Sequence, residues 1–412
     1  MSETAPASPA PTLADRLVGE RFGVADDKLM IGGVPVTALA ERFGTPFYAY
    51  DVDGIRRTFR ALQGAVDGFA EVYFSIKANP RADVARVLVE EGAGLEIASG
   101  QEFLVARAAG CAPERILFAG PGKGEAELRL AIQGGIGEIH LESFEEIELV
   151  SQLAAETRRI VDVSIRVNPV ASAQGGAMRM GGKPAPFGFD EEIIDDVIAA
   201  IRAERRLRLT GVHLFAGTQV LDAAVLIQQW RHGLSVAAAI ADRFGAPLSS
   251  IDLGGGLGIP YHGPDATLDL AAVKAAIPDL KAAQAAHAGI RDAKVILEPG
   301  RYLMGPNGAY VMAVRSVKMS RGHRFLVCDG GMHHHLAASG NLGQVIKRDY
   351  PIVPASRMTD SARSECSIVG PLCTPLDTLG RQTPMPEMKA GDLIAVLQSG
   401  AYFVTASPAG FL

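Results

Sequence analysis

The 412-residue sequence is poor in cysteine, in long apolar runs and in charge of one sign. Its four cysteines are scattered without CxxC spacing, which argues against zinc and against a disulfide framework and fits a reducing cytoplasm. No apolar stretch reaches the roughly 18 residues of a membrane span. The net charge is only −6, and no run of lysine or arginine marks a nucleic-acid or membrane surface. We therefore expect a cytoplasmic protein that binds neither nucleic acid nor membranes.

The N-terminal segment, residues 1–17, lacks the basic start and apolar core of a signal peptide. It is rich in alanine, proline and serine, so we expect a disordered tail. Hydrophobic residues make up 48% of the chain, which is enough for a large core. The length exceeds one ordinary domain and is sufficient for two.

Short apolar, β-branched runs alternate with longer amphipathic stretches from about residue 45 to residue 300. Eight runs are candidate strands, and a helix-like segment, Ile55–Val66, precedes the first. This alternation predicts an α/β fold, a TIM-like (β/α)8 barrel whose parallel strands are covered on both faces. The candidate strands are Val72–Ala78, Gly94–Ser99, Ile116–Gly120, Glu138–Ser143, Val161–Asn168, Leu209–Gly217, Ile251–Gly256 and Lys294–Gly300.

The pattern after Arg301 consists of strand-like runs separated by Gly/Pro turns, without regular helices between them. This predicts a second, β-rich domain, which the hairpin-like segment Lys28–Val36 is expected to join. We therefore divide the chain into residues 1–45 (the tail and the segment that joins the β-domain), 46–302 (the barrel) and 303–412 (the C-terminal β-domain). The strand-like runs are Tyr310–Met319, Arg324–Cys328, Ser367–Val369 and Leu393–Leu397.

Several unusual side chains fall at the C-terminal ends of the predicted strands, where barrels carry their active sites. Lys77 closes the first strand in YFSIKANP, and His213 ends the sixth in GVHLFAGTQ. Glu298 ends the eighth in LEPGRY, three residues before Arg301. Each has an ordinary explanation when it is taken alone: a lysine that reaches solvent, a satisfied core histidine and a structural ion pair.

Three further segments carry residues that bind or react in other proteins. IDLGGGLG places Gly254–Gly256 at the end of the seventh strand, where backbone N–H groups can approach an anion; a tight turn is the alternative. Cys373 lies between prolines in GPLCTPLD, either as a presented thiol or as a small buried hydrophobe. His333–His335 are consecutive, and neighbouring strand residues point to opposite faces, so we expect no metal there.

Together these segments resemble the alanine-racemase-like fold of pyridoxal 5′-phosphate (PLP) enzymes, and within it the diaminopimelate/ornithine/arginine decarboxylase family. The resemblance covers nearly the whole chain, in one order: YFSIKANP, GLEIASGQE, SIRVNP, GVHLFAGTQ, IDLGGGLG, EPGRY, CDGGM, GPLCTPLD and SGAYF. A complete ordered set is far more specific than any single motif. The resemblance implies a PLP-dependent carboxy-lyase that forms a homodimer with shared active sites.

The resemblance also implies a role for each residue. Lys77 would be the Schiff-base lysine, Glu298 would hold the ring nitrogen protonated, and Cys373 would act as general acid in the active site of a partner subunit. The implied phosphate-binding residues are Gly254, Gly255 and Gly256 with Thr218, Arg301 and Tyr402. His213, Phe215 and Gly300 complete the implied cofactor site, and Arg301, Thr374, Asp377 and Tyr402 are the implied substrate-binding residues.

The chemistry of decarboxylation fits this set. Loss of CO2 leaves a carbanion, which PLP delocalises into its ring. A carboxylate such as Glu298 at the ring nitrogen keeps that ring cationic, whereas racemases of this fold typically have arginine there. Glu298 therefore favours decarboxylation over racemisation. A thiol such as that of Cys373 then supplies the proton to Cα.

Some positions depart from the common branch of the family. Phe215 stands where a histidine usually stacks on the cofactor ring, and Thr374 follows Cys373 where an acidic residue usually binds a distal ammonium. The Arg-Pro…Tyr segment that follows DGGM in diaminopimelate decarboxylases is replaced by HHHLAASGNLGQ. The resemblance also leads us to expect a further strand or tail beyond the final SPAGFL.

A smaller subfamily is more similar at MGGKPAPFGFD, DGGMHHHLAASGNLGQVIKRDYP and CTPLD. It contains exosortase-associated decarboxylases and the butirosin-type enzyme that decarboxylates glutamyl on an acyl-carrier protein. We therefore expect a modified or acyl-carrier-protein-linked amino acid as substrate, in a biosynthetic pathway. The alternatives are a decarboxylase of a free small molecule such as diaminopimelate, and a non-catalytic regulatory relative. Retention of Lys77, Glu298, Cys373 and Tyr402 argues against the latter.

Overall fold

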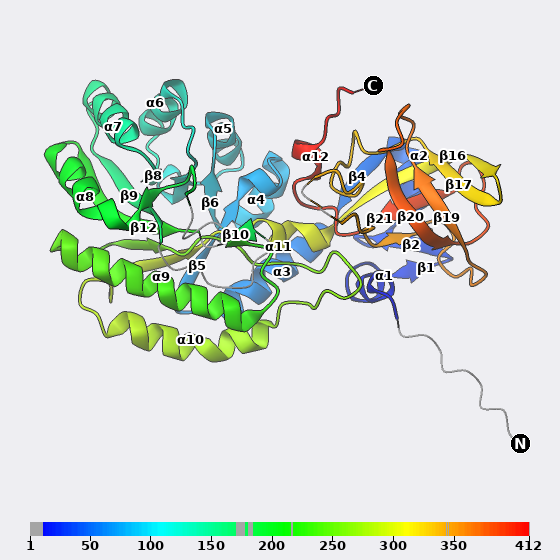
Figure 1. The fold of residues 1–412 in the computed structure, drawn as a ribbon, viewed down its shortest axis with the longest axis horizontal. Coiled ribbons are helices and arrows are strands. Elements are labelled where there is room, and N and C mark those ends of the chain that lie inside the picture. The colour runs from blue at the N-terminus through cyan, green and yellow to red at the C-terminus, as the bar shows by residue number, and fades with distance from the viewer. Residues whose placement is uncertain are drawn as a thin grey trace, which may run out of the picture. The chain divides into compact units, whose positions relative to one another are not determined.

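The computed structural model describes residues 11–169, 178–179, 184–215, 217–342, 344 and 346–411, which form two compact units (Figure 1). The barrel unit comprises Ile55–Ile259 and Ala266–Met304. The β-rich unit comprises the described residues up to Gly54, the short segment Pro260–Asp265 and the described residues from Gly305 onward.

The barrel unit contains a closed ring of eight parallel strands, which confirms the predicted (β/α)8 fold. Hydrogen bonding follows the order β9-β12-β14-β15-β5-β6-β7-β8 and returns from β8 to β9, so the ring has no open edge between its ends. The observed strands mostly end before the predicted ones, because the polar residues at their C-terminal ends lie in loops. The strands are β5 (Ala70–Ser75), β6 (Gly94–Ile97), β7 (Ile116–Phe118), β8 (Glu138–Leu141), β9 (Val161–Asn168), β12 (Leu207–Leu214), β14 (Ser250–Asp252) and β15 (Lys294–Leu297).

Helices cover the outside of this ring (Figure 1). Side-chain caps fix the first turns of two of them: Ser99 accepts a hydrogen bond from the Glu102 N–H, and Ser143 accepts one from the Glu146 N–H. The helices are α3 (Val52–Ala65), α4 (Ala82–Glu90), α5 (Gly100–Ala108), α6 (Glu125–Gln133), α7 (Phe144–Glu156), α8 (Ile194–Ala203), α9 (Ala223–Phe244) and α10 (Leu270–Ala285). Short additions are β11 (Phe189–Asp190) beside β9, the pair β10 (Met178–Arg179) and β13 (Gly217–Thr218), and α11 (Arg301–Met304).

A polar cluster lies inside the barrel, where side chains from four adjacent strands meet. Glu138 accepts hydrogen bonds from Ser164, from Thr210 at 2.8 Å and from Ser250 at 2.6 Å. Burial alone would raise the pKa of Glu138, but hydrogen bonds from His140 and from the serine hydroxyls outweigh it and lower the pKa to about 2. The carboxylate is therefore ionised and fully bonded at neutral pH.

The β-rich unit is built on a seven-stranded sheet in the order β18-β21-β16-β17-β19-β20, with β4 paired to β16. A three-stranded sheet, β1-β2-β3, belongs to the same unit. The strands are β1 (Val24–Ala25), β2 (Lys28–Ile31), β3 (Val34–Pro35), β4 (Phe47–Tyr50), β16 (Gly308–Ser320), β17 (His323–Cys328), β18 (Ile352–Val353), β19 (Ser364–Val369), β20 (Thr378–Met385) and β21 (Leu393–Val396). Its helices are α1 (Leu13–Leu17), α2 (Val36–Phe43) and α12 (Phe403–Ala406), and a π-helical turn spans Val18–Phe22.

The N-terminal prediction is wrong for the described residues that precede residue 18. Thr12 caps α1, and Leu13 and Leu17 are buried in a core shared with Leu29 and Val353. Residues 1–10 lie outside the described part. The division into units also differs from the predicted boundary at residue 46, because Phe47–Tyr50 pairs antiparallel with β16 and so belongs to the β-rich unit.

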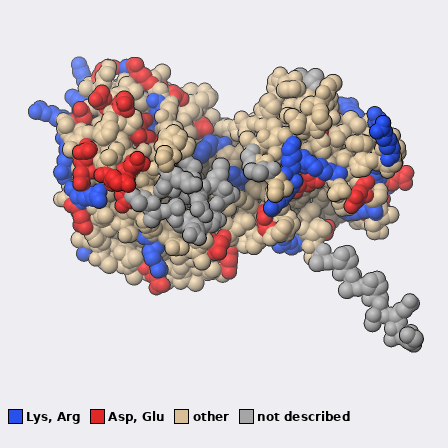
Figure 2. All heavy atoms as spheres, in the orientation of Figure 1, with Lys and Arg blue, Asp and Glu red and all other residues tan. Residues whose placement is uncertain are grey.

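None of the described helices combines the length and apolarity that crossing a membrane requires. On the face shown in Figure 2, acidic and basic side chains are interspersed over the barrel unit and are not gathered by sign.

We expect Glu138→Gln to lower the free energy of unfolding by about 2–4 kcal/mol at pH 7, because an amide cannot accept all three hydroxyl hydrogen bonds. The folded pKa of about 2 lies below the ordinary 4.5, so the stabilisation is present above about pH 4.5 and is lost as the pH falls toward 2. Chemical denaturation at several pH values measures this, with the exposed Glu148→Gln as control. Equal stability of Glu138→Gln and wild type at pH 7 would contradict the account.

Candidate active site

The loop after β14 is a tight glycine-rich turn, Gly254–Gly256, here called the glycine cradle. Gly254 has φ +69° and Gly256 has φ +90°, conformations that favour glycine. A Cβ on Gly254 would lie 2.6 Å from the Leu214 carbonyl oxygen, and one on Gly256 would lie 2.7 Å from that of Gly217. Asp252 Oδ1 accepts the Gly254 N–H at 2.7 Å and fixes the start of the loop. The cradle therefore requires glycine, as a phosphate-binding loop does.

Lys77 lies in a 3₁₀ turn, Ile76–Ala78, directly after β5 and not at the end of the strand itself. Its Nζ is 2.7 Å and 3.0 Å from the two carboxylate oxygens of Glu96, which is 1% exposed on β6. The Lys77 side chain is 47% exposed. A buried carboxylate thus orients an amine that reactants can reach. Sequence reasoning missed Glu96, although a charged residue inside the apolar run GLEI was the available signal.

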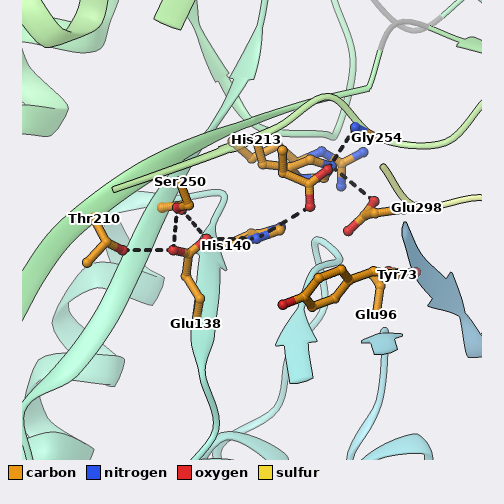
Figure 3. Close-up of polar contacts among 12 residues, drawn as sticks. Tyr73, Glu96, Glu138, His140, Thr210, His213, Ser250, Gly254 and Glu298 are labelled. Carbon is orange, nitrogen blue, oxygen red and sulfur yellow. Dashed lines mark hydrogen bonds and ion pairs between the residues drawn. The ribbon is translucent and has the colours of Figure 1, made fainter. Parts of the chain in front are cut away.

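Glu298 follows β15 and lies in a cluster of buried ionisable side chains. Its Oε2 is 3.5 Å from His213 Nε2, and the His213 ring centroid is 4.4 Å from that of His140. One potential metal-ligating atom from each of His140, His213, Asp252 and Glu298 lies within 4.8 Å of the others (Figure 3). His140 and Asp252 were not predicted as site residues.

The charges in this cluster follow from burial. Burial lowers the pKa of His213 to about 4 despite the neighbouring Glu298, so the imidazole is neutral at pH 7. Burial, followed by the negative charge of Glu298, raises the pKa of Asp252 well above its ordinary value. Burial alone would also raise the pKa of Glu298, but His213, His140 and Asp252 outweigh it and lower that pKa. Glu298 therefore carries the negative charge.

The residues present fit PLP. Glu298 Oε1 is buried without a hydrogen-bond partner among the described residues, so it can accept the N–H of a protonated ring. Because Asp252 accepts the Gly254 N–H, the N–H groups that the glycine cradle can offer to a phosphate are those of Gly255 and Gly256. Phe215, which is half-buried after β12, lies against Gly254. Gly300 packs so closely on the turn of Lys77 that a Cβ there would lie 2.9 Å from Ala78 Cβ.

Thr218 and Arg301, the other residues predicted for the cofactor site in the barrel unit, closely follow Phe215 and Gly300 in the sequence. Thr218 ends β13, which follows Phe215, and Arg301 begins α11, which follows Gly300. Arg166 on β9 was not predicted; its Nη1 is 2.7 Å from Glu142 Oε1, and both side chains are buried. The structure therefore brings Lys77 and Gly300 together, and Phe215 and Gly254 together, within one unit.

The β-rich unit carries Cys373, Thr374, Asp377 and Tyr402. Cys373 is exposed in the turn that precedes β20. Asp377 is 2% exposed: its Oδ1 accepts the Met332 N–H at 2.6 Å, and its Oδ2 accepts the Leu372 N–H at 2.9 Å. Both oxygens are used to join the CDGGM and GPLCTPLD loops. Asp377 is therefore an anchor of the loop that carries Cys373, and its role in substrate binding stays a prediction.

The histidine run helps to hold the segment that carries Tyr402. His335 is fully buried, stacks on Phe403 with ring centroids 4.0 Å apart, and its Nε2 lies 3.0 Å from Ser399 Oγ. Tyr402 lies between these two contacts in the sequence and adopts φ 68° at the N-terminus of α12. His335 therefore has a packing role in the SGAYF segment.

A (β/α)8 barrel with an accessible lysine, a glycine cradle and a buried carboxylate on its last strand, accompanied by a β-rich unit, defines a PLP enzyme of the alanine-racemase-like class. Residues 52–305 match the pyridoxal-binding domain of the pyridoxal-dependent decarboxylases. The chain belongs to this decarboxylase family, and PLP is its cofactor.

Two curated relatives and one solved structure illustrate the range of the family. The chain is 38% identical over 380 residues to L-glutamyl-[BtrI acyl-carrier protein] decarboxylase of Niallia circulans, covering 92% of this chain and 88% of that protein. It is 32% identical over 383 residues to diaminopimelate decarboxylase of Aquifex aeolicus, covering 92% and 86%. Diaminopimelate decarboxylase of M. jannaschii in complex with L-lysine superposes with a TM-score of 0.86 at 25% identity, covering 94% and 89%.

We expect Asp377→Asn to lower the free energy of unfolding by about 1–3 kcal/mol, because the amide NH2 group faces one of two backbone N–H donors that the carboxylate now satisfies. Chemical denaturation measures the change. Asp360→Asn is the matched control, since Asp360 pairs only with arginine near the surface, at 3.2 Å from Arg357. Equal losses in the two variants would show that Asp377 is not the anchor.

Proposed function

We propose that this PLP-dependent amino-acid decarboxylase acts on an amino acid that is linked to an acyl-carrier protein or otherwise modified, in a biosynthetic pathway. The observation that carries the proposal is Thr374 beside the exposed Cys373, where relatives that bind diamino acids usually have an acidic residue. A distal ammonium would have no counter-charge at that position, and a buried unpaired cation is costly. The 38% identity to an enzyme named for an acyl-carrier-protein substrate supports the same class.

The residues of the barrel unit would bind and orient the PLP cofactor. Bound PLP supplies the electron sink for the pair released when the Cα–carboxylate bond breaks. Lys77 would hold the cofactor through its amine, which Glu96 orients at 2.7 Å. The Gly254–Gly256 cradle would bind the phosphate together with Thr218, Arg301 and Tyr402, as the family resemblance implies.

Glu298 would favour one of two possible reactions. Its Oε1 would accept the N–H of the PLP ring, and a carboxylate at that position keeps the ring nitrogen protonated. A protonated ring favours decarboxylation over racemisation. Phe215 would supply a flat apolar face for the ring without a hydrogen bond. The Cys373 thiol would then donate its proton to Cα. A reduced thiol is needed for that step, which is why we place the enzyme in the cytoplasm.

The homodimer is part of this proposal, because the resemblance implies that Cys373 enters the site of a partner subunit. Mixing an inactive Lys77→Ala chain with an inactive Cys373→Ala chain should then restore activity. Random pairing gives about half hybrid dimers, each with one intact site, so about a quarter of wild-type activity is expected. Carbon dioxide release after mixing measures the restoration.

The control replaces the Cys373→Ala chain with a Lys77→Ala/Cys373→Ala double variant, which can form no intact site in any pairing. Native mass spectrometry verifies that the subunits exchange. If exchanged mixtures remain inactive, the thiol acts within its own chain or not at all.

The substrate class is tested with a panel of free and linked amino acids. We expect poor turnover of free lysine, ornithine and diaminopimelate, and better turnover of glutamyl linked through its side-chain carboxyl to an acyl-carrier protein, with the α-amino and α-carboxyl groups free. Thr374→Glu should raise activity toward the diamino acids relative to the linked substrate, because it supplies the missing counter-charge. Ser361→Glu adds the same charge at another exposed position of the β-rich unit and serves as control.

A second candidate is decarboxylation of a free amino acid, which the 32% identity to diaminopimelate decarboxylase favours. A kcat/KM of about 10⁴ M⁻¹s⁻¹ or more on free lysine, ornithine or diaminopimelate would establish it and reject the linked substrate. A regulatory relative without activity is disfavoured by the retained Lys77, Glu298, Cys373 and Tyr402.

A further inference from the structure

The inside of the barrel next to Glu298 contains an unusual number of buried polar atoms without hydrogen-bond partners among the described residues. They are His140 Nδ1, His213 Nδ1, Asp252 Oδ2 and Glu298 Oε1. The two Nε2 atoms have only carboxylate contacts, at 3.3 Å from His140 to Glu138 Oε1 and at 3.5 Å from His213 to Glu298 Oε2. The four residues come from β8, from β12, from β14 and from the end of β15. Figure 3 labels three of them, His140, His213 and Glu298. Buried polar atoms are usually bonded, so this cluster requires an explanation.

A metal ion is the first alternative to consider. The cluster offers two imidazoles and two carboxylates, but its ligand atoms are spread over as much as 4.8 Å, and His140 Nε2 is 4.0 Å from Asp252 Oδ2. Zinc at about 2.0–2.1 Å from each ligand would bring these atoms to roughly 3.3 Å from one another. A metal would also bind Glu298, the residue proposed to face the cofactor ring. The geometry therefore favours a proton-sharing network.

The carboxylates of Asp252 and Glu298 have oxygen atoms within 4.8 Å of each other. Such a buried pair shares one proton, because two negative charges cannot both be stabilised away from water. Asp252 is 0% exposed and Glu298 is 6% exposed. Asp252 Oδ1 accepts the Gly254 N–H at 2.7 Å, so the proton belongs on Oδ2, the oxygen without an acceptor role. The direction of the pKa shifts agrees, since burial and Glu298 raise the pKa of Asp252.

The imidazole rings of His213 and His140 lie next to this pair. His213 Nε2 is 3.5 Å from Glu298 Oε2, and the ring of His140 packs against that of His213. The other charged groups that face the cluster are compensated elsewhere. Arg166 is paired with Glu142 at 2.7 Å, and Glu138 accepts hydrogen bonds from three hydroxyl groups.

We propose that Asp252, as a neutral acid, and His213, as a neutral imidazole, are positioning residues for Glu298. His213 holds the carboxylate at Oε2, and Asp252, within 4.8 Å, shares its proton so that a single negative charge stays on Glu298, with Oε1 left for the ring nitrogen of PLP. This inference rests on the proposed role of Glu298. Asp252 also holds Gly254, so one side chain couples the ring-nitrogen contact to the phosphate cradle.

The proposal is tested with paired substitutions that either keep or remove each hydrogen bond. Asp252→Asn imitates the neutral acid, because its oxygen can accept from Gly254 while its NH2 group donates to Glu298. Asp252→Ala removes both contacts. His213→Gln keeps a donor at the position of Nε2, whereas His213→Leu removes it. His287→Leu is the control, since His287 lies at the surface of the same unit near Asp242.

Three readouts are needed: the dissociation constant of PLP for the apoprotein, the pH at which the visible absorption band of the bound cofactor titrates, and the melting temperature of the apoprotein. We expect Asp252→Ala and His213→Leu to weaken PLP binding at least about tenfold and to shift the titration of the band by about one pH unit or more. Asp252→Asn and His213→Gln should stay within about threefold of wild type. A merely structural role would change the melting temperature without moving the band.

The possible outcomes separate this inference from the proposed function. If Glu298→Gln leaves the band and its titration unchanged, the role of Glu298 itself fails. If Glu298→Gln changes the band while Asp252→Ala and His213→Leu do not, only the positioning network fails. If Asp252→Asn weakens PLP binding and shifts the titration of the band as much as Asp252→Ala does, Asp252 is ionised in the wild type. One equivalent of transition metal in the purified protein, lost in Asp252→Ala, would replace the network with a metal site.

Discussion

The burial of a negative charge at the end of the last barrel strand is the constraint on which the site depends. Glu298 can remain ionised away from water only if its neighbours carry no competing charge and present hydrogen-bond donors. A neutral His213 and a raised pKa at Asp252 satisfy this requirement. The same arrangement leaves Oε1 without a partner among the described residues, ready for a cationic ring. The accessible Lys77 amine and the glycine cradle then lie at the C-terminal ends of strands in the same barrel unit.

Most of the barrel could be predicted from the sequence, because strands covered on both faces are nearly continuous in apolar residues. β6 and β8 are buried throughout, and their predicted starts at Gly94 and Glu138 agree with the structure. The glycine-rich turn could also be predicted from the sequence, since Gly254 and Gly256 adopt backbone conformations that other residues rarely adopt. Lys77 and Glu298 drew attention as charged residues at the ends of apolar strands, and the ordered set of family motifs then implied their roles.

The partners of these residues could not be predicted, because they depend on which side chains point into the closed ring. In the sequence, Glu96, His140 and Asp252 are single residues within predicted strands. Only the register of the barrel brings them toward Lys77 or Glu298. The contacts of Asp377 could not be predicted for a similar reason. The resemblance implied a role in substrate binding, but the sequence does not show that the two carboxylate oxygens accept the N–H groups of Met332 and Leu372, which lie 40 residues apart in the chain. The buried helix α1 was missed because it spans only Leu13–Leu17.

The central claim is that this chain carries PLP on Lys77 to decarboxylate an amino acid. Reduction of the cofactor-loaded protein with borohydride, followed by tryptic peptide mapping, tests it most directly. A pyridoxyl group on Lys77 blocks cleavage there, so the account predicts a single modified peptide that spans Ala61–Arg81. A pyridoxyl group on another lysine, such as the buried Lys123, or no modified peptide at all would contradict the account.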